Sequence, residues 1–287
     1  EWYPSVADIG PGAIPMLTAD LRTILVTNTN SMIRWSARLD TSATNFPVES
    51  RENHYFAARE TDASPLKVSA IEQAGYEHEK FLFYRGFGNF GTPLKVRSEG
   101  NRLVLQNTGD IPLKHLFIYH LENDRAQVIS LNSLPVGKEQ VVQLNDLLVV
   151  SKEFAVSRIG HELIAALRNE RLYEPEAKAM VKTWESSWFE EGLRVLYLLP
   201  EQWTEQVLAM TLDPQPQELV RVMVGRAEII PSGTERKLVD LLLAAKDQQD
   251  YMTEDVRALL KPLGRFAPAV LQRALQQVNP TQTAPEL

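Results

Sequence analysis

The chain has 287 residues, of which 44% are hydrophobic and 23% charged, and it contains no cysteine. The lack of cysteine excludes disulfides, thiolate metal sites and cysteine nucleophiles. The net charge of −7 and the scattered Lys and Arg residues disfavour nucleic acid as a partner, because nucleic-acid-binding surfaces are usually basic. No apolar run reaches the ~18 residues that span a bilayer, so we expect a soluble chain without a membrane span. At roughly 100–200 residues per domain, the length predicts two domains.

The first half reads as β-structure. After a turn-rich start, residues 33–39 alternate apolar and polar, which is typical of a strand with one buried face. Short strand-like segments then recur at ~8–12-residue spacing, with turn residues between them. The predicted strands are 66–68, 80–85, 94–97, 102–107, 115–120, 127–131 and 140–144. This spacing predicts an N-terminal antiparallel β-sandwich over residues 1–146.

The hydrophobic period changes near residue 146, from two to three and four. We therefore expect residues 147–287 to be mainly helical, with a strand pair near 207–230, which gives an α+β fold. The predicted helices are 147–169, 175–198, 232–246 and two short ones separated near Pro262 and Gly264, and the predicted strand pair is 208–212 with 219–224. The polar residues 279–287 are expected to form a frayed tail.

Residues 86–91 match the dinucleotide-binding pattern G-x-G-x-x-G letter for letter. That pattern binds phosphate because a helix N-terminus follows it. Here residues 92–96 follow, and their composition predicts a strand. We interpret the motif as a glycine-rich connection between strands, so the sequence predicts no nucleotide cofactor.

His161 and Glu162 begin a zinc-peptidase pattern, H-E-x-x-H, whose fifth position is occupied by Ala165. Residues 188–197 resemble the helix that supplies the third ligand in gluzincin peptidases, which often carry Trp, Glu-Gly and a later Tyr. With the second His replaced, we predict no metal and assign no catalytic residue. The alternative is a degenerate gluzincin-like hydrolase that uses Glu191 or Glu190 as acid/base beside His161.

On the predicted helix 175–198, steps of three and four place Glu191 on one apolar stripe with Trp184 and Trp188. A buried carboxylate costs several kcal/mol unless it is paired or protonated. Arg194, Arg221 and Arg226 are candidate partners for it. Two interpretations stay open: a structural Glu–Arg pair, or a carboxylate that lines a ligand pocket.

The candidate binding residues are aromatic and charged side chains, of the kinds that dominate binding hot spots. They are Trp184, Trp188, Glu191, Arg194 and Arg85. Residues 54–62 form another polar-aromatic cluster, in which we expect a strand and turn and a local pair of Arg59 with Asp62. His78 lies between two glutamates and is interpreted as a surface residue.

Five segments together resemble a family of uncharacterised bacterial proteins, many of which begin with an export signal and an additional β segment. The segments are 2–4 (WYP), 54–63 (HYFAARETDA), 78–86 (HEKFLFYRG), 183–200 (TWESSWFEEGLRVLYLLP) and 219–228 (LVRVMVGRAE). The resemblance implies a secreted, periplasmic or cell-envelope protein with a signal sequence upstream of residue 1. It carries over no catalytic residue.

We therefore predict an extracytoplasmic binding or scaffold protein with a groove between the β-sandwich and the helical half. Its expected partner is another cell-envelope protein. The hydrolase above is the enzyme alternative. A third hypothesis is an interaction protein that binds an extended partner segment at an exposed sheet edge.

Overall fold

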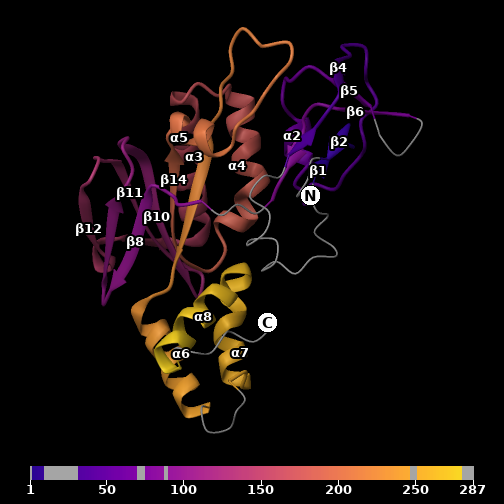
Figure 1. Cartoon of the computed structure of the whole chain (residues 1–287). Coiled ribbons are helices and arrows are strands. Elements are labelled where there is room, and N and C mark those ends of the chain that lie inside the picture. Colours follow the sequence, from indigo (N-terminus) through magenta and orange to yellow (C-terminus); the bar gives the residue numbers. More distant parts are fainter. Residues whose placement is uncertain (1, 10–31, 70–74, 87–89, 246–250, 280–287) are drawn as a thin grey trace. The chain divides into compact units, whose positions relative to one another are not determined.

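The computed structural model describes residues 2–9, 32–69, 75–86, 90–245 and 251–279 (Figure 1). It contains helices and antiparallel strands, which confirms the α+β class. The density of contacts divides the chain into two compact units. Unit 1 comprises Glu1–Gly91 and Leu172–Trp184, and unit 2 comprises Thr92–Arg171 and Glu185–Leu287. Among the helices in the described ranges, none has the length and apolar character needed to cross a membrane.

Unit 2 is built on a five-stranded antiparallel sheet with the strand order β13-β11-β10-β14-β15. Its strands are β10 (Leu113–Glu122), β11 (Arg125–Leu134), β13 (Leu148–Ser151), β14 (Gly192–Leu199) and β15 (Met223–Ile229). A two-residue turn joins β10 to β11. Asn123 and Asp124 have positive φ of 49° and 59°, as a two-residue type I′ hairpin turn requires. Strands from both sides of residue 146 share this sheet, so that residue is not a boundary between the compact units.

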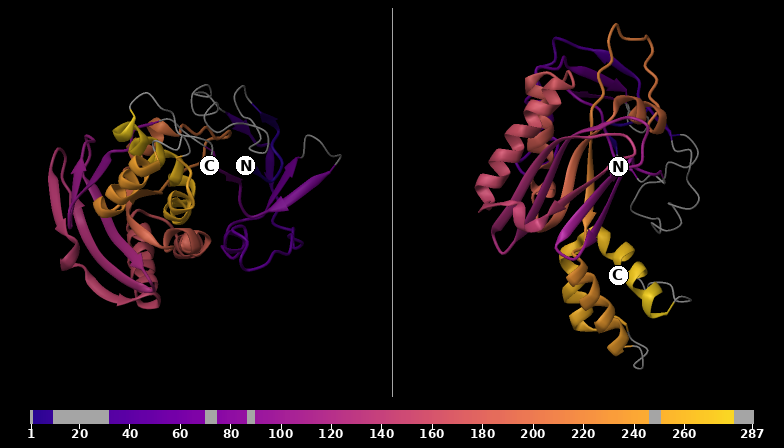
Figure 2. Two further views of the ribbon diagram at one scale, coloured as in Figure 1. Left: turned by 90° about the horizontal axis from the view of Figure 1, so that it is seen from below. Right: turned by 90° about the vertical axis from the view of Figure 1, so that its left-hand side faces the viewer.

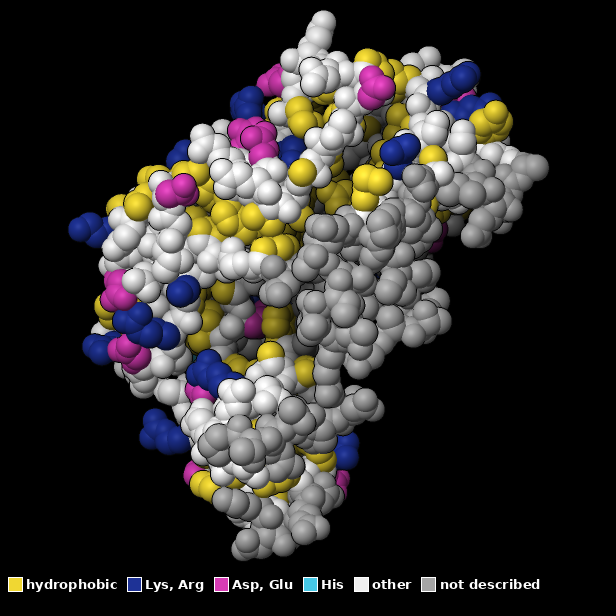
Figure 3. Space-filling model, in the orientation of Figure 1, with side chains coloured by type: hydrophobic (Ala, Val, Ile, Leu, Met, Phe, Trp, Pro, Cys, Tyr) yellow, Lys and Arg dark blue, Asp and Glu magenta, His cyan; other side chains and the backbone are white. Residues whose placement is uncertain are grey.

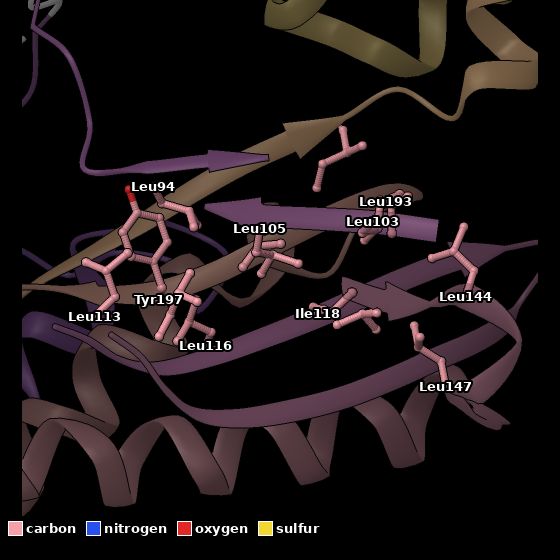
Figure 4. Packing of buried hydrophobic residues seen from close by; sticks show 14 of the residues in the cluster. Leu94, Leu103, Leu105, Leu113, Leu116, Ile118, Leu144, Leu147, Leu193 and Tyr197 are labelled. Carbon is pink, nitrogen blue, oxygen red and sulfur yellow. The ribbon is translucent and has the colours of Figure 1, made fainter. Parts of the chain in front are cut away.

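A three-stranded antiparallel sheet, β12-β9-β8, shares one hydrophobic core with the five-stranded sheet. Its strands are β8 (Leu94–Glu99), β9 (Arg102–Asn107) and β12 (Glu139–Gln143). Figure 4 shows Leu103 and Leu105 of β9 and Leu116 and Ile118 of β10 in the space between the sheets, and all four are fully buried. The period of two along each strand directs these side chains to one face.

Helix α3 (Lys152–Asn169) lies along β10, β11 and β13 on the five-stranded sheet (Figure 2). Ser151 is its N-cap, and the Ser151 side chain accepts a hydrogen bond of 3.3 Å from the backbone N–H of Phe154. This cap satisfies one of the N–H groups that the first helical turn leaves without a partner. The 3-10 turn η1 (Leu144–Asp146) precedes β13.

The C-terminal helices, which the sequence predicts, form a second hydrophobic core in unit 2. They are α6 (Ser232–Ala245), α7 (Glu254–Leu260), the 3-10 segment η3 (Lys261–Phe266) and α8 (Ala267–Val278). Leu242, Leu271 and Leu275 are fully buried in this core. Gly264, with φ of 49°, separates α7 from α8 at the predicted break. Residues 280–287 of the expected frayed tail lie outside the described ranges.

Three predicted elements of the second half are wrong. The predicted helix 147–169 begins only at Lys152, because residues 148–151 form the strand β13. Helix α4 (Glu174–Trp188) ends ten residues before Leu198, and β14 replaces the rest of the predicted helix. Because β14 lies between β10 and β15, seven of its eight residues are buried, and a strand buried on both faces shows no period of two. The predicted strand 208–212 is also absent: α5 (Glu201–Val207) ends just before it, and β14 is the strand that pairs with β15.

Unit 1 contains short strands, one short helix and part of a second helix. The strands are β1 (Trp2–Tyr3), β2 (Asp8–Ile9), β3 (Ile33–Arg34), β4 (Ala37–Leu39), β5 (Leu66–Ser69), β6 (Tyr76–Glu79) and β7 (Phe83–Tyr84). They form an antiparallel sheet β4-β5-β6 and the pairs β1-β7 and β2-β3. Helix α2 (Phe56–Arg59) lies where a strand and turn were expected, and the first eleven residues of α4 complete the unit.

Charged side chains are mixed by sign on the face of the molecule that Figure 3 shows. Lys and Arg side chains lie among Asp and Glu side chains there, and the described residues of that face form no broad area of one charge.

Candidate functional site: an aromatic pocket in unit 1

Unit 1 contains a row of aromatic rings in mutual contact. Tyr55 stacks on Tyr3 with ring centroids 4.8 Å apart and on Phe81 at 5.6 Å. Phe83 meets Tyr55 edge-on at 5.2 Å, and it stacks on Trp184 at 6.4 Å. We call these five residues the aromatic row. Separations of 4.5–7 Å with stacked or edge-on geometry are the favourable ones for aromatic pairs.

A pocket of about 370 Å³ opens beside the aromatic row. We call it the aromatic pocket. Its lining residues are His54, Tyr55, Ala58, Thr61, Ala63, residues 80–84, Glu176, Ala179, Met180, Thr183 and Trp184. The volume falls within the range of small-molecule sites, and the lining is mainly apolar with a few polar groups, as in such sites.

Two kinds of local structure form the walls of the aromatic pocket. The residues from α4 recur at steps of three and four, so they share one face of that helix. The run 80–84 supplies the other wall. Phe81 and Phe83 alternate along it, so both rings lie on one side. Sequence reasoning placed Trp184 among the binding residues and missed Tyr55, Phe81 and Phe83. The alternation of Phe81 and Phe83 was the available signal.

A buried ion pair holds the elements behind the aromatic row together. Glu79, fully buried at the end of β6, accepts hydrogen bonds from Arg59 Nε at 3.0 Å and from Arg59 Nη2 at 2.5 Å. The hydroxyl of Tyr3 donates to the same carboxylate at 2.7 Å. These donors offset the cost of removing the carboxylate from water. The predicted local pair of Arg59 with Asp62 is replaced by this pair, which joins α2 to β6.

The ionisation of these groups follows from their burial. Burial, together with the hydrogen bond to Glu79, raises the pKa of Tyr3 well above its ordinary range, so its hydroxyl remains a donor. Burial alone would lower the pKa of Arg59. The hydrogen bonds and the charge of Glu79 outweigh that effect and raise its pKa, so Arg59 stays charged.

Three polar side chains of the aromatic pocket, those of Lys80, Glu176 and Thr183, have hydrogen-bond partners. Lys80 Nζ donates to the backbone O of Thr61 at 2.8 Å, and Glu176 accepts from the backbone N–H of Tyr173 at 3.0 Å. Thr183 Oγ1 donates to the backbone O of His54 at 3.4 Å. One cation and one anion give the lining no net charge. The arrangement therefore suits stacking and apolar contact with a neutral group.

The five predicted binding residues do not form one site. Trp184 lines the aromatic pocket of unit 1, and Arg85 is exposed just after β7. Trp188, Glu191 and Arg194 belong to unit 2. Trp188 and Arg194 are buried there, whereas Glu191 is exposed.

Arg194 closes the C-terminus of α4. Its guanidinium donates to the backbone O of Trp188 at 2.9 Å, the backbone O of Glu191 at 2.6 Å and the backbone O of Glu190. Its Nε donates to the carboxylate of Glu228 at 2.9 Å. Carbonyls at a helix end need such donors because the helix leaves them unpaired. Burial lowers the pKa of Arg194, and the charge of Glu228 opposes that shift.

The predicted burial of Glu191 is wrong. The helix ends at Trp188, so Glu191 leaves the expected stripe, and its carboxylate accepts from the backbone N–H of Asn123 at 3.2 Å. Glu190 is also exposed and pairs with Arg226 at 2.6 Å. A structural Glu–Arg pair does exist beside this turn, but its carboxylate belongs to Glu228, on the neighbouring strand β15.

The described residues contain no metal-binding cluster that would support the resemblance to zinc peptidases. His161 is exposed on α3, and its Nδ1 bonds the backbone O of Ser157 at 2.6 Å. Glu162 pairs with Arg158 at 2.9 Å. Within the described ranges, no group of three or more His, Asp or Glu side chains could hold a metal ion. The segment that resembles a third-ligand helix forms the end of α4, a turn and β14.

The glycine motif at 86–91 lies partly outside the described residues, which omit 87–89. The element that follows it is β8, as predicted, and no helix N-terminus is present there to hold a phosphate.

Comparison with protein-family models, with curated proteins and with solved structures finds no match to this chain.

Proposed function

We propose that the protein is an extracytoplasmic binding protein and that the aromatic pocket of unit 1 is its ligand site. The observation that carries this proposal is the pocket of about 370 Å³ beside five aromatic rings in mutual contact. In this proposal unit 2, with its two sheets arranged as a sandwich, is the rigid scaffold of the protein.

The lining indicates the class of ligand. Each aromatic contact with a flat or apolar group contributes about 0.5–1.5 kcal/mol beyond the area that it buries. Lys80 and Glu176 are engaged with the backbone, so neither offers a strong charge to a ligand. We therefore expect a neutral ligand that carries a planar or apolar group.

The binding test uses a neutral naphthylamine dye whose fluorescence rises in apolar surroundings. We expect the intact chain to bind it, and Trp184→Ala and Tyr84→Ala to lose that binding, because both side chains line the aromatic pocket. Tyr76→Ala is the matched control, since Tyr76 is an exposed tyrosine of unit 1 outside the lining. Circular dichroism of each variant checks that it is folded.

Two results would contradict the proposed site. The first is that the dye does not bind the intact chain. The second is that the folded Trp184→Ala and Tyr84→Ala variants bind the dye with the same affinity as Tyr76→Ala.

The extracytoplasmic location rests on the resemblance described above. Its test is fractionation of the producing cells, followed by detection of the protein with an antibody. We expect the protein in the periplasmic or envelope fraction. Recovery with the cytoplasmic enzymes would overturn the location and leave the ligand site to the dye experiment.

A further inference from the structure

Strand β13 is an edge of the five-stranded sheet, and among the described residues β11 is the one strand that pairs with it. Its sequence, Leu-Val-Val-Ser, carries no charge and no proline. Leu148 and Val149 are 48% and 47% exposed, and Phe154 in the first turn of α3 is 54% exposed. An apolar edge strand is a template for pairing with another strand, because its outward N–H and C=O groups lack partners.

The other edges of the two sheets carry charged side chains. The opposite edge, β15, contains Arg226 and Glu228, and β12 contains Glu139. Charged residues on an edge are a common protection against unwanted pairing. The lack of such residues on β13 indicates that this edge is covered when the protein functions.

The sequence around β13 is complementary to itself. The backbone is extended over the five residues from Leu147 to Ser151, and Val149 is the middle one. An acidic residue, Asp146, precedes it and a basic one, Lys152, follows it. In the described part of the chain neither forms an ion pair with another residue.

An antiparallel pair of identical segments centred on Val149 brings Asp146 of each copy opposite Lys152 of the other. A shift of the centre to a point between Val149 and Val150 would place Asp146 opposite Glu153, and like charges opposite one another destabilise a strand pair. The charges therefore favour one register. An arrangement with a two-fold axis also closes, so it stops at two copies.

We propose that two copies of this chain associate through antiparallel pairing of their β13 strands, centred on Val149. The two five-stranded sheets then form one continuous sheet, and Leu148, Val149 and Phe154 become covered. This association uses unit 2 alone and is independent of the aromatic pocket.

The first test measures the mass of the full chain by sedimentation velocity over a wide range of concentration. We expect a dimer that dissociates on dilution. Val149→Lys should abolish it, because two lysines would meet at the two-fold axis. Val141→Lys is the matched control, since Val141 is 46% exposed on the edge strand β12 of the other sheet, and it should leave the dimer intact.

The second test exchanges the charges at the ends of the segment. Asp146→Lys and Lys152→Asp should each weaken the dimer, because each places like charges opposite one another. An equimolar mixture of the two variants should restore association, since every Lys then faces an Asp. The mixture also excludes misfolding as the cause of the loss.

Three results would overturn the proposal. They are a monomer at all concentrations, a dimer that Val149→Lys leaves unchanged, and a mixture of the two charge variants that stays as weakly associated as each variant alone.

Discussion

At the residue scale, the guanidinium of Arg194 in unit 2 is a buried cation, 1% exposed. It joins the end of α4 to β15 through three carbonyls and one carboxylate. A buried cation that loses its carboxylate keeps the cost of its desolvation without the compensating charge. The turn from α4 into β14 therefore depends on Glu228 more than on either exposed glutamate of that turn.

We expect Glu228→Gln to lower the free energy of unfolding by about 3 kcal/mol, because the carbonyl acceptors of Arg194 remain while its counter-charge is lost. Urea denaturation followed by tryptophan fluorescence measures this change. The control is Glu99→Gln, which removes a half-exposed partner of Arg97 and should leave the stability nearly unchanged. Equal losses in the two variants would show that burial of Arg194 does not set the cost.

A pH dependence follows from Tyr197, which is 2% exposed in the core of unit 2. Burial raises its pKa from 10.0 to about 12. A raised folded-state pKa gives stability that is complete below the unfolded value and is lost as the pH rises. Two units of pKa correspond to about 2–3 kcal/mol.

We therefore expect the free energy of unfolding to fall between pH 10 and pH 12 by a larger amount in the intact chain than in Tyr197→Phe. Urea titrations at a series of pH values measure the difference. Tyr173→Phe, at a tyrosine that is 76% exposed, should behave like the intact chain. If the free energy of unfolding of the intact chain and of Tyr197→Phe changed with pH in parallel, Tyr197 would not be the source of the pH dependence.

Sequence reasoning about single residues succeeded where the signal is local and failed where it is not. Trp184 was singled out from a helical stripe, and the structure places it in the lining of the aromatic pocket. The partners of Arg59 and Arg194 were missed because Glu79 and Glu228 lie 20 and 34 residues away in the chain. Nothing in one sequence shows which distant carboxylate a buried arginine will meet.

At the element scale, alternation and turn residues predicted β8, β9, β10, β11 and β12 within a few residues. The same logic failed for β14, because a central strand with both faces buried has a continuous apolar run instead of alternation. The predicted helix 175–198 ran through the glycine that starts β14. In the structure Gly192 has φ of 122°, a conformation that side-chain-bearing residues rarely adopt and that favours a break.

The pairing of β14 with β15 depends on a second glycine. Gly225 lies opposite Tyr197, and a Cβ at Gly225 would lie 2.5 Å from the tyrosine ring. The ring is buried. We expect Gly225→Ala to destabilise the protein by about 1–3 kcal/mol, as overpacking of a core does. Thermal unfolding measures the change.

Gly233→Ala is the matched control, since a Cβ there meets nothing within 4 Å and the residue lies in α6. It should leave the protein as stable or stabilise it by up to ~1 kcal/mol. Combining Gly225→Ala with Tyr197→Leu should cost less than the sum of the two single changes, because the smaller side chain removes the clash. Strict additivity would argue against the proposed contact.

At the scale of the whole molecule, different interactions stabilise the two compact units. The Glu79–Arg59 pair stabilises unit 1, whereas Leu105 belongs to the core of unit 2. We expect denaturant unfolding in two steps, because proteins with more than one domain commonly depart from two-state behaviour.

Glu79→Gln should shift one of these steps and Leu105→Ala the other, the latter by about 2–5 kcal/mol. Hydrogen exchange with mass spectrometry assigns each step to residues 75–86 or to residues 102–134. A single transition that both variants shift together would show that the units unfold as one.

The composition of unit 1 has a consequence for biosynthesis. Its residues up to Gly91 are translated before unit 2, but the wall that α4 contributes to the aromatic pocket is translated only after the first β-strands and helix of unit 2. Until residue 184 has emerged, Phe83 and Tyr55 lack Trp184 and the helical face that flanks them. The nascent protein therefore carries exposed rings through much of its synthesis, and a holding chaperone is the natural protection for them.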